Sequence, residues 1–154
     1  MSIKQIFASA TTTSDPIQKE ELGCRRISSN GKGFVYCEAE SDLVIGFVCG
    51  AFSASSATDY RITPDISDCA TRIPVGIALA TISKGHFCYL QYEGRCTHVK
   101  TDGNVTESMV LYWSADAIAK KVPAGNEHLM FGVSQYTDSG SISTMVHLNR
   151  CLMI

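Results

Sequence analysis

The sequence predicts an all-β protein, built as a small β-barrel or β-sandwich with an extended N-terminal arm. Short apolar and β-branched runs recur about every ten residues, which is the strand spacing of sandwiches and barrels. Gly, Pro, Asp and Asn stand between these runs, where turns require them. Helical patterns are few: residues 113–121 fit a helix or a hairpin equally well, and residues 17–22 suffice for one short helical turn.

The first predicted strand, at residues 34–38, follows a turn in which Asn30 and Gly31 tolerate positive φ. Further strands are expected at residues 43–49, 59–63, 75–82, 86–92, 96–100, 109–113, 119–122, 129–135 and 143–148. Residues 75–90 and 131–148 echo each other, because each contains an apolar-Gly-apolar strand, a polar connection ending in glycine and a second alternating strand. Each unit is predicted to be a β-hairpin, and two units favour a sheet closed on itself over a repeat array.

Two parts of the chain differ in composition. Residues 8–15 are almost entirely small and polar, and Pro16 then blocks regular strand pairing. We therefore expect an N-terminal arm at residues 1–25 and a β-rich domain at residues 26–154. A chain of 154 residues is long enough to bury one core without disulfide or metal support.

The charge pattern argues against two classes of partner. Thirteen lysines and arginines face fifteen acidic residues, and no basic block could neutralise a row of phosphates, so nucleic acid is not an expected partner. The longest apolar stretch, residues 43–52, is far short of the roughly 20 residues that cross a bilayer, so no membrane span is expected. The first ten residues lack the apolar core of a signal peptide, which predicts synthesis and folding in a cytoplasm.

The seven cysteines are an odd number without a CxxC pair, and most lie in apolar surroundings. They are predicted to be free, buried and reduced rather than to form a disulfide framework. No nucleophile elbow, phosphate-binding loop, dinucleotide fingerprint or HExxH motif is present, and the four histidines are scattered over strands and one loop. The sequence therefore predicts a protein without enzymatic activity, cofactor or bound metal.

One metal alternative depends on strand register. His86, Cys88, Cys96 and His98 could ligate zinc if residues 86–92 and 96–100 formed a hairpin. A two-residue turn at 93–94 would put the two ligand pairs on opposite faces, whereas a three-residue loop at 92–94 would bring all four to one face. Structural zinc ligands usually come as CxxC knuckles, so zinc is disfavoured here.

Aromatic residues offer a second alternative. Tyr89, Tyr92, Tyr112 and Trp113 could stack on sugars. Aromatic residues that alternate along strands more often form core and cross-strand pairs, which is the expected use here.

Several of these runs resemble the small head-decoration and capsid-stabilising (cement) proteins of tailed bacteriophages. The resemblance lies in residues 31–36, 75–82 and 85–94, and in the second half in residues 110–113, 119–122 and 129–133. It covers roughly residues 22 to 150 and is carried by glycines and apolar alternation. Cys88 stands where the family often has glycine, and Tyr89 stands where tryptophan is common.

The resemblance implies a structural virion protein that binds the outer surface of a phage capsid and stabilises contacts between major capsid subunits. It further implies a homo-oligomer, with a trimer favoured, on the capsid exterior after synthesis in the bacterial host. Ile3, Ile6 and Phe7 are the expected apolar anchors of the arm, with Pro16 as a further capsid contact. Deleting residues 1–15 is then expected to leave the domain folded but to weaken attachment. The alternative is a receptor-binding or fibre-base module that recognises host surface glycans.

Overall fold

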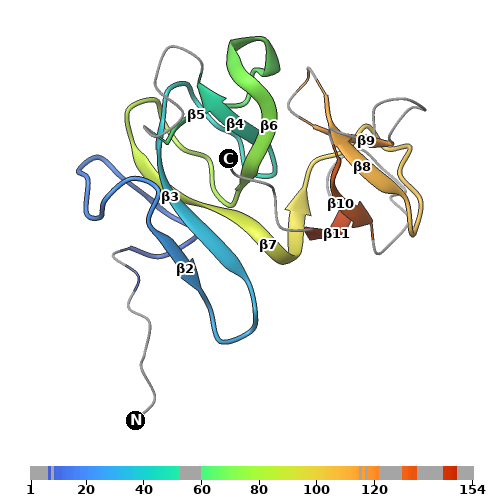
Figure 1. The fold of residues 1–154 in the computed structure, drawn as a ribbon, viewed down its shortest axis with the longest axis horizontal. Coiled ribbons are helices and arrows are strands. Elements are labelled where there is room, and N and C mark those ends of the chain that lie inside the picture. The colour runs from blue at the N-terminus through green and yellow to red at the C-terminus, as the bar shows by residue number, and fades with distance from the viewer. Residues whose placement is uncertain are drawn as a thin grey trace.

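The computed structural model describes residues 7, 9–52, 60–114, 116, 118–121, 130–134 and 144–148. Within these residues the chain forms strands and one short 3-10 helix (Figure 1), which confirms the all-β class. No helix of the described chain is long and apolar enough to cross a membrane. The elements are β1 (Ser14–Asp15), β2 (Arg25–Ile27), β3 (Gly33–Ala39), β4 (Val48–Phe52), β5 (Arg61–Thr63), η1 (Ile66–Asp68), β6 (Cys69–Ala78), β7 (Phe87–Val99), β8 (Val110–Trp113), β9 (Ala119–Lys121), β10 (Met130–Ser134) and β11 (Thr144–Leu148).

Five strands close into a barrel, so the barrel is the correct choice of the two predicted architectures. Around the ring the order is β3-β5-β4-β6-β7, and pairing of β3 with β7 closes it. The β3–β5 pair is parallel, and the other four pairs are antiparallel. Strand β2 extends the sheet beyond β3 as a hairpin partner.

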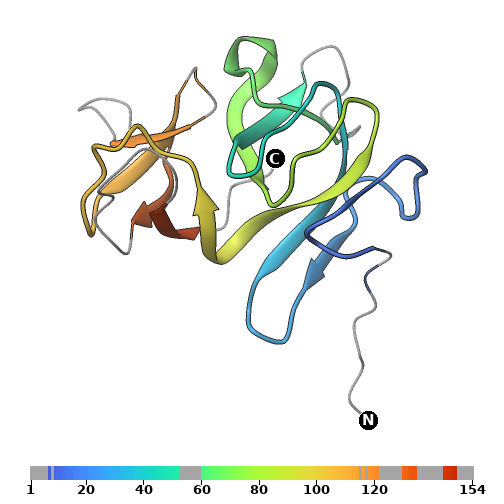
Figure 2. The ribbon, with the colours of Figure 1, turned by 180° about the vertical axis from the view of Figure 1, so that it is seen from behind.

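A second, smaller sheet lies beside the barrel (Figures 1 and 2). The far end of β7 pairs with β11, and β10, β8 and β9 follow in that order. The two predicted hairpins are confirmed as the antiparallel pairs β6–β7 and β10–β11. Residues 113–121 take the hairpin alternative, because Trp113 pairs with Ala119, and residues 17–22 form no helical turn.

The two strands expected at residues 86–92 and 96–100 are a single strand, because β7 runs through both without reversing, so the hairpin that the zinc alternative required does not form. The turn signal at Glu93-Gly94 marks a β-bulge instead: Gly33 pairs with Glu93, whereas its neighbour Phe34 pairs with Gln91. Gly94 has φ +84°, and a Cβ there would lie 2.9 Å from the carbonyl oxygen of Gly31. Glycine is therefore used to bend a continuous strand. The strand expected at residues 43–49 lies later in the chain, since β4 spans Val48–Phe52.

One hydrophobic core serves both sheets. Barrel residues such as Val35, Val48 and Ile77 belong to the same buried cluster as Leu111 and Trp113 of the second sheet. Trp113 is fully buried, and a Cβ added to Gly50 of β4 would lie 2.4 Å from its ring. The indole thus occupies the space that a side chain on β4 would fill, which joins the second sheet to the barrel.

Gly50→Ala is expected to lower the free energy of unfolding by about 3 kcal/mol, because the added methyl would overlap the Trp113 ring in a packed core. Urea denaturation followed by tryptophan fluorescence measures this effect. The matched control is Gly85→Ala, where no atom lies within 4 Å and only the positive φ opposes alanine, at a cost of about 1 kcal/mol. Equal losses in the two variants would contradict the proposed contact.

Candidate functional site

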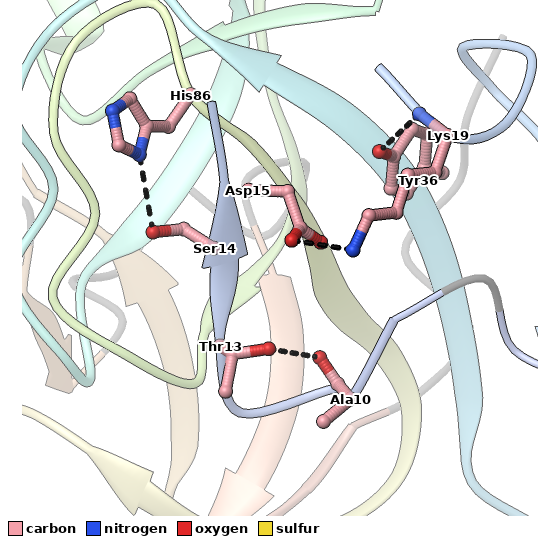
Figure 3. Close-up of polar contacts among 7 residues, drawn as sticks. All are labelled: Ala10, Thr13, Ser14, Asp15, Lys19, Tyr36 and His86. Atoms are coloured by element: carbon pink, nitrogen blue, oxygen red, sulfur yellow. Dashed lines mark hydrogen bonds and ion pairs between the residues drawn. The ribbon is translucent and has the colours of Figure 1, made fainter. Parts of the chain in front are cut away.

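The N-terminal segment, residues 9–24, lies against the outside of the barrel. Thr13 donates its hydroxyl to the carbonyl of Ala10 (3.1 Å), and this turn leads the chain into β1 (Figure 3). Strand β1 pairs antiparallel with the start of β7, Ser14 opposite Cys88 and Asp15 opposite Phe87. The small polar composition of this segment therefore does not prevent it from adding a short strand to the barrel wall.

Side chains hold β1 in this position, as Figure 3 shows. The Ser14 hydroxyl lies 3.4 Å from Nδ1 of His86. The Lys19 ammonium donates to the Asp15 carboxylate at 2.6 Å, and this hydrogen bond lowers the pKa of Asp15. The backbone N–H of Lys19 donates to the hydroxyl of Tyr36 on β3 (3.1 Å). These contacts tie the segment to both strands that close the barrel.

A second polar group surrounds Glu20. Its carboxylate accepts a hydrogen bond from Arg26 at 3.0 Å, and the side chain is 10% exposed. Burial alone would raise the pKa of Glu20, but hydrogen bonds from Tyr89, Cys24 and Arg26, with the Arg26 charge, outweigh burial and lower it. The carboxylate is therefore held in its charged form.

Apolar contacts complete the docking. Phe7 packs edge-to-face on Phe34 and Tyr89, with ring centroids 5.6 and 5.3 Å apart. Phe34, Tyr36 and Tyr89 form a separate buried cluster on the outer face of the barrel wall, whereas Val35 belongs to the inner core. Strands β3 and β7 are thus covered on both faces here, which explains why residues 34–37 and 87–90 are continuously apolar rather than alternating.

The four predicted capsid-contact residues lie in different settings. Phe7 is half-buried against the outer cluster, and Pro16 is exposed beside Ile17, which is 72% exposed. Ile3 and Ile6 lie outside the described residues. The division into an arm of residues 1–25 and a domain from residue 26 stays a prediction, and the described part of the arm contacts the barrel.

A groove of about 470 Å³ opens between this segment, the β2–β3 turn and β7. Phe7 and Phe34 line its apolar part, and Lys32, Gln91 and His98 are among its polar lining residues. Sequence reasoning missed this groove, since its walls come from three stretches that no local pattern connects.

The positions of the aromatic and cysteine residues argue against the sugar-stacking and zinc alternatives. Tyr89, Tyr92 and Trp113 are at most 3% exposed, so they are core residues and present no face to a sugar, while Tyr112 is half-buried. The zinc alternative required a hairpin, but Cys88 and Cys96 are eight positions apart on one strand, a separation on the order of 20 Å or more. Those two thiols cannot share a metal ion in this fold.

Five of the cysteines are buried free thiols, as predicted: Cys37, Cys49, Cys69, Cys88 and Cys96. Cys37 and Cys88 face each other across the β3–β7 pair that closes the barrel. Burial raises the pKa of Cys88 to about 12 and that of Cys37 well above its usual value. The thiolate, which is the reactive form, is therefore strongly disfavoured inside the barrel.

Alkylation should distinguish these thiols from the rest of the chain. We expect iodoacetamide to leave the five buried cysteines unmodified in native protein and to modify them fully in denaturant, as located by peptide mass spectrometry. The half-buried Cys24 provides an internal comparison with the five. Rapid modification of Cys88 under native conditions would contradict the burial described here.

Glu20→Gln is expected to reduce stability at pH 6 by about 1 kcal/mol, because the charged carboxylate gives the stronger hydrogen bonds. The folded pKa of Glu20 is lowered, so its contribution is present above its ordinary value of 4.5 and is lost as pH falls through the folded value. The difference between wild type and variant should therefore shrink in acid, as urea melts at several pH values would measure. Glu21→Gln, at an exposed neighbour, is the control, and a difference that does not shrink as the pH falls would count against this assignment.

The fold is similar to that of the N base of head fibre gp8.5 from bacteriophage phi29. The two structures align with a TM-score of 0.55 at 16% sequence identity, over 79% of this chain and 97% of the head-fibre chain. No protein-family model matches the sequence, and no curated protein matches it. The likeness is therefore one of fold.

Proposed function

We propose that this protein is a structural component of a tailed-phage virion, which binds the outer surface of the capsid and stabilises contacts between major capsid subunits. The observation that carries the proposal is the fold similarity to a phage head-fibre base, which extends over 97% of that chain. The similarity of residues 31–36, 75–82 and 85–94 to phage head-decoration proteins supports the same assignment from the sequence.

The physics of such a role fits the described molecule. A decoration protein requires a stable body and an area that can bridge neighbouring subunits, and many weak contacts repeated over a shell, or shared within a trimer, add up to strong attachment. A closed barrel provides such a body, since ring closure leaves few free strand edges. The exposed Pro16 and Ile17 lie at the surface of the N-terminal segment and offer apolar area for a contact.

The base of a head fibre is a second candidate, and the similarity to the phi29 fibre base favours it specifically. A fibre base also attaches to the head, but its task is to hold a projecting appendage rather than to strengthen the shell. The two functions differ in what binding does to the capsid.

Purified protein added to undecorated shells of the parent phage should bind saturably at a fixed number of copies per lattice unit. If it is a cement protein, the temperature at which shells disrupt will rise with occupancy, because a ligand that binds the intact state stabilises it. Binding without such a rise supports the fibre base. Absence of binding would overturn both.

The arm is best tested by a shorter deletion than residues 1–15, because that deletion would also remove β1 and the Phe7 contact. Removing residues 1–6 takes away Ile3 and Ile6 and keeps Phe7. We expect lower occupancy on shells and an unchanged melting temperature of the free protein. Ile17→Ser is a companion variant that removes the exposed apolar side chain of the N-terminal segment. Full occupancy after the deletion would exclude Ile3 and Ile6 as anchors.

A further inference from the structure

The groove between the N-terminal segment, the β2–β3 turn and β7 has the dimensions of a small-molecule site. Its volume of about 470 Å³ falls within the usual range for ligand pockets. The half-buried Phe7 ring gives one wall an apolar surface, and it stands edge-on to the almost fully buried Phe34. Hydroxyl side chains, among them Thr11, Thr12 and Thr97, supply most of the remaining polar lining.

Gln91 is the polar residue whose environment is most informative. The side chain is 1% exposed and lines the groove, and its Nε2 donates to the carbonyls of Glu93 and Arg95, both at 3.1 Å. These bonds use both amide protons, so the amide oxygen Oε1 is the part of the side chain that can accept a further hydrogen bond. A hydroxyl or N–H group of a ligand is the matching donor for this oxygen.

The charge of the lining favours an anion. Lys32 and His98 line the groove, and none of the described lining residues is acidic. Among the described residues, no carboxylate forms an ion pair with Lys32. An ammonium group without a carboxylate partner, next to several hydroxyl groups, matches a carboxylate or phosphate on the ligand.

We propose that this groove binds an anionic saccharide, a sugar that carries a carboxylate or a phosphate. The apolar face of the sugar ring packs on Phe7, sugar hydroxyls donate to Gln91 and exchange hydrogen bonds with the threonine hydroxyls, and the anionic group contacts Lys32. An acidic side chain of a peptide could also pair with the Lys32 ammonium. Its carboxylate contains only hydrogen-bond acceptors, so it could not donate to Gln91. Binding here does not involve Ile3 or Ile6, and of the expected capsid contacts only Phe7 lines the groove.

The test is a titration of 15N-labelled full-length protein with glucuronate, glucose 6-phosphate and, as the neutral match, glucose. We expect glucuronate, glucose 6-phosphate or both to shift the amide signals of Gln91, Thr97 and His98, and glucose to bind at least tenfold more weakly. Lys32→Met should weaken the anionic sugars about tenfold. Lys84→Met removes the same charge at an exposed position that pairs with Glu40, and it should leave binding unchanged.

Three outcomes would overturn the proposal. Inorganic phosphate that produces the same shifts at the same concentration would show a simple anion site, and a Glu-rich peptide that binds where the sugars fail would show a peptide site. No shift with any sugar would exclude saccharide binding. The titration contains no capsid, so a negative titration says nothing against shell binding. Likewise, absence of shell binding says nothing against saccharide binding.

Discussion

Strand β7 is the element on which both sheets depend. Its first half belongs to the barrel, where it pairs with β3 on one edge and with β1 and β6 on the other, and its second half pairs with β11 of the second sheet. The change of partners coincides with the bulge before Gly94, where the positive φ bends the strand without ending it. A single backbone segment of thirteen residues thus fixes the second sheet relative to the barrel.

The same strand explains why the N-terminal segment belongs to the folded body. Residues of β3 and β7 that point away from the barrel interior include Phe34, Tyr36 and Tyr89, all of them almost completely buried. Leaving three such rings in water would cost several kilocalories per mole, on the order of 2 kcal/mol for each side chain. The segment covers them, and its Glu20 and Lys19 contacts hold it in place. The exposed Pro16 and Ile17 are therefore carried by a segment that is fixed to the barrel.

Sequence reasoning predicted the fold class, most strands and the burial of the cysteines, because those depend on local composition and alternation. It failed where one local sequence signal is compatible with two different structures. Glu93-Gly94 is as typical of a two-residue turn as of a bulge, and only the partners of β7 decide between them. Phe34 to Cys37 could have revealed the covered outer face, since four consecutive apolar residues indicate burial on both sides of a strand. The groove had no such signal, because Thr12, Lys32 and Gln91 meet only through the tertiary fold.

The parallel β3–β5 pair follows from the odd number of strands in the ring. Strand directions can alternate all the way round a closed ring only if the number of strands is even, so a five-membered ring must contain at least one pair that runs the same way. Here that pair spans two residue positions, with backbone bonds from Glu38 to Tyr60 and from Glu40 to Ile62, and the Glu40–Arg61 ion pair (3.1 Å) lies next to it. An odd number of strands thus imposes one short parallel joint on the ring, and it lies next to the longer antiparallel β3–β7 pair.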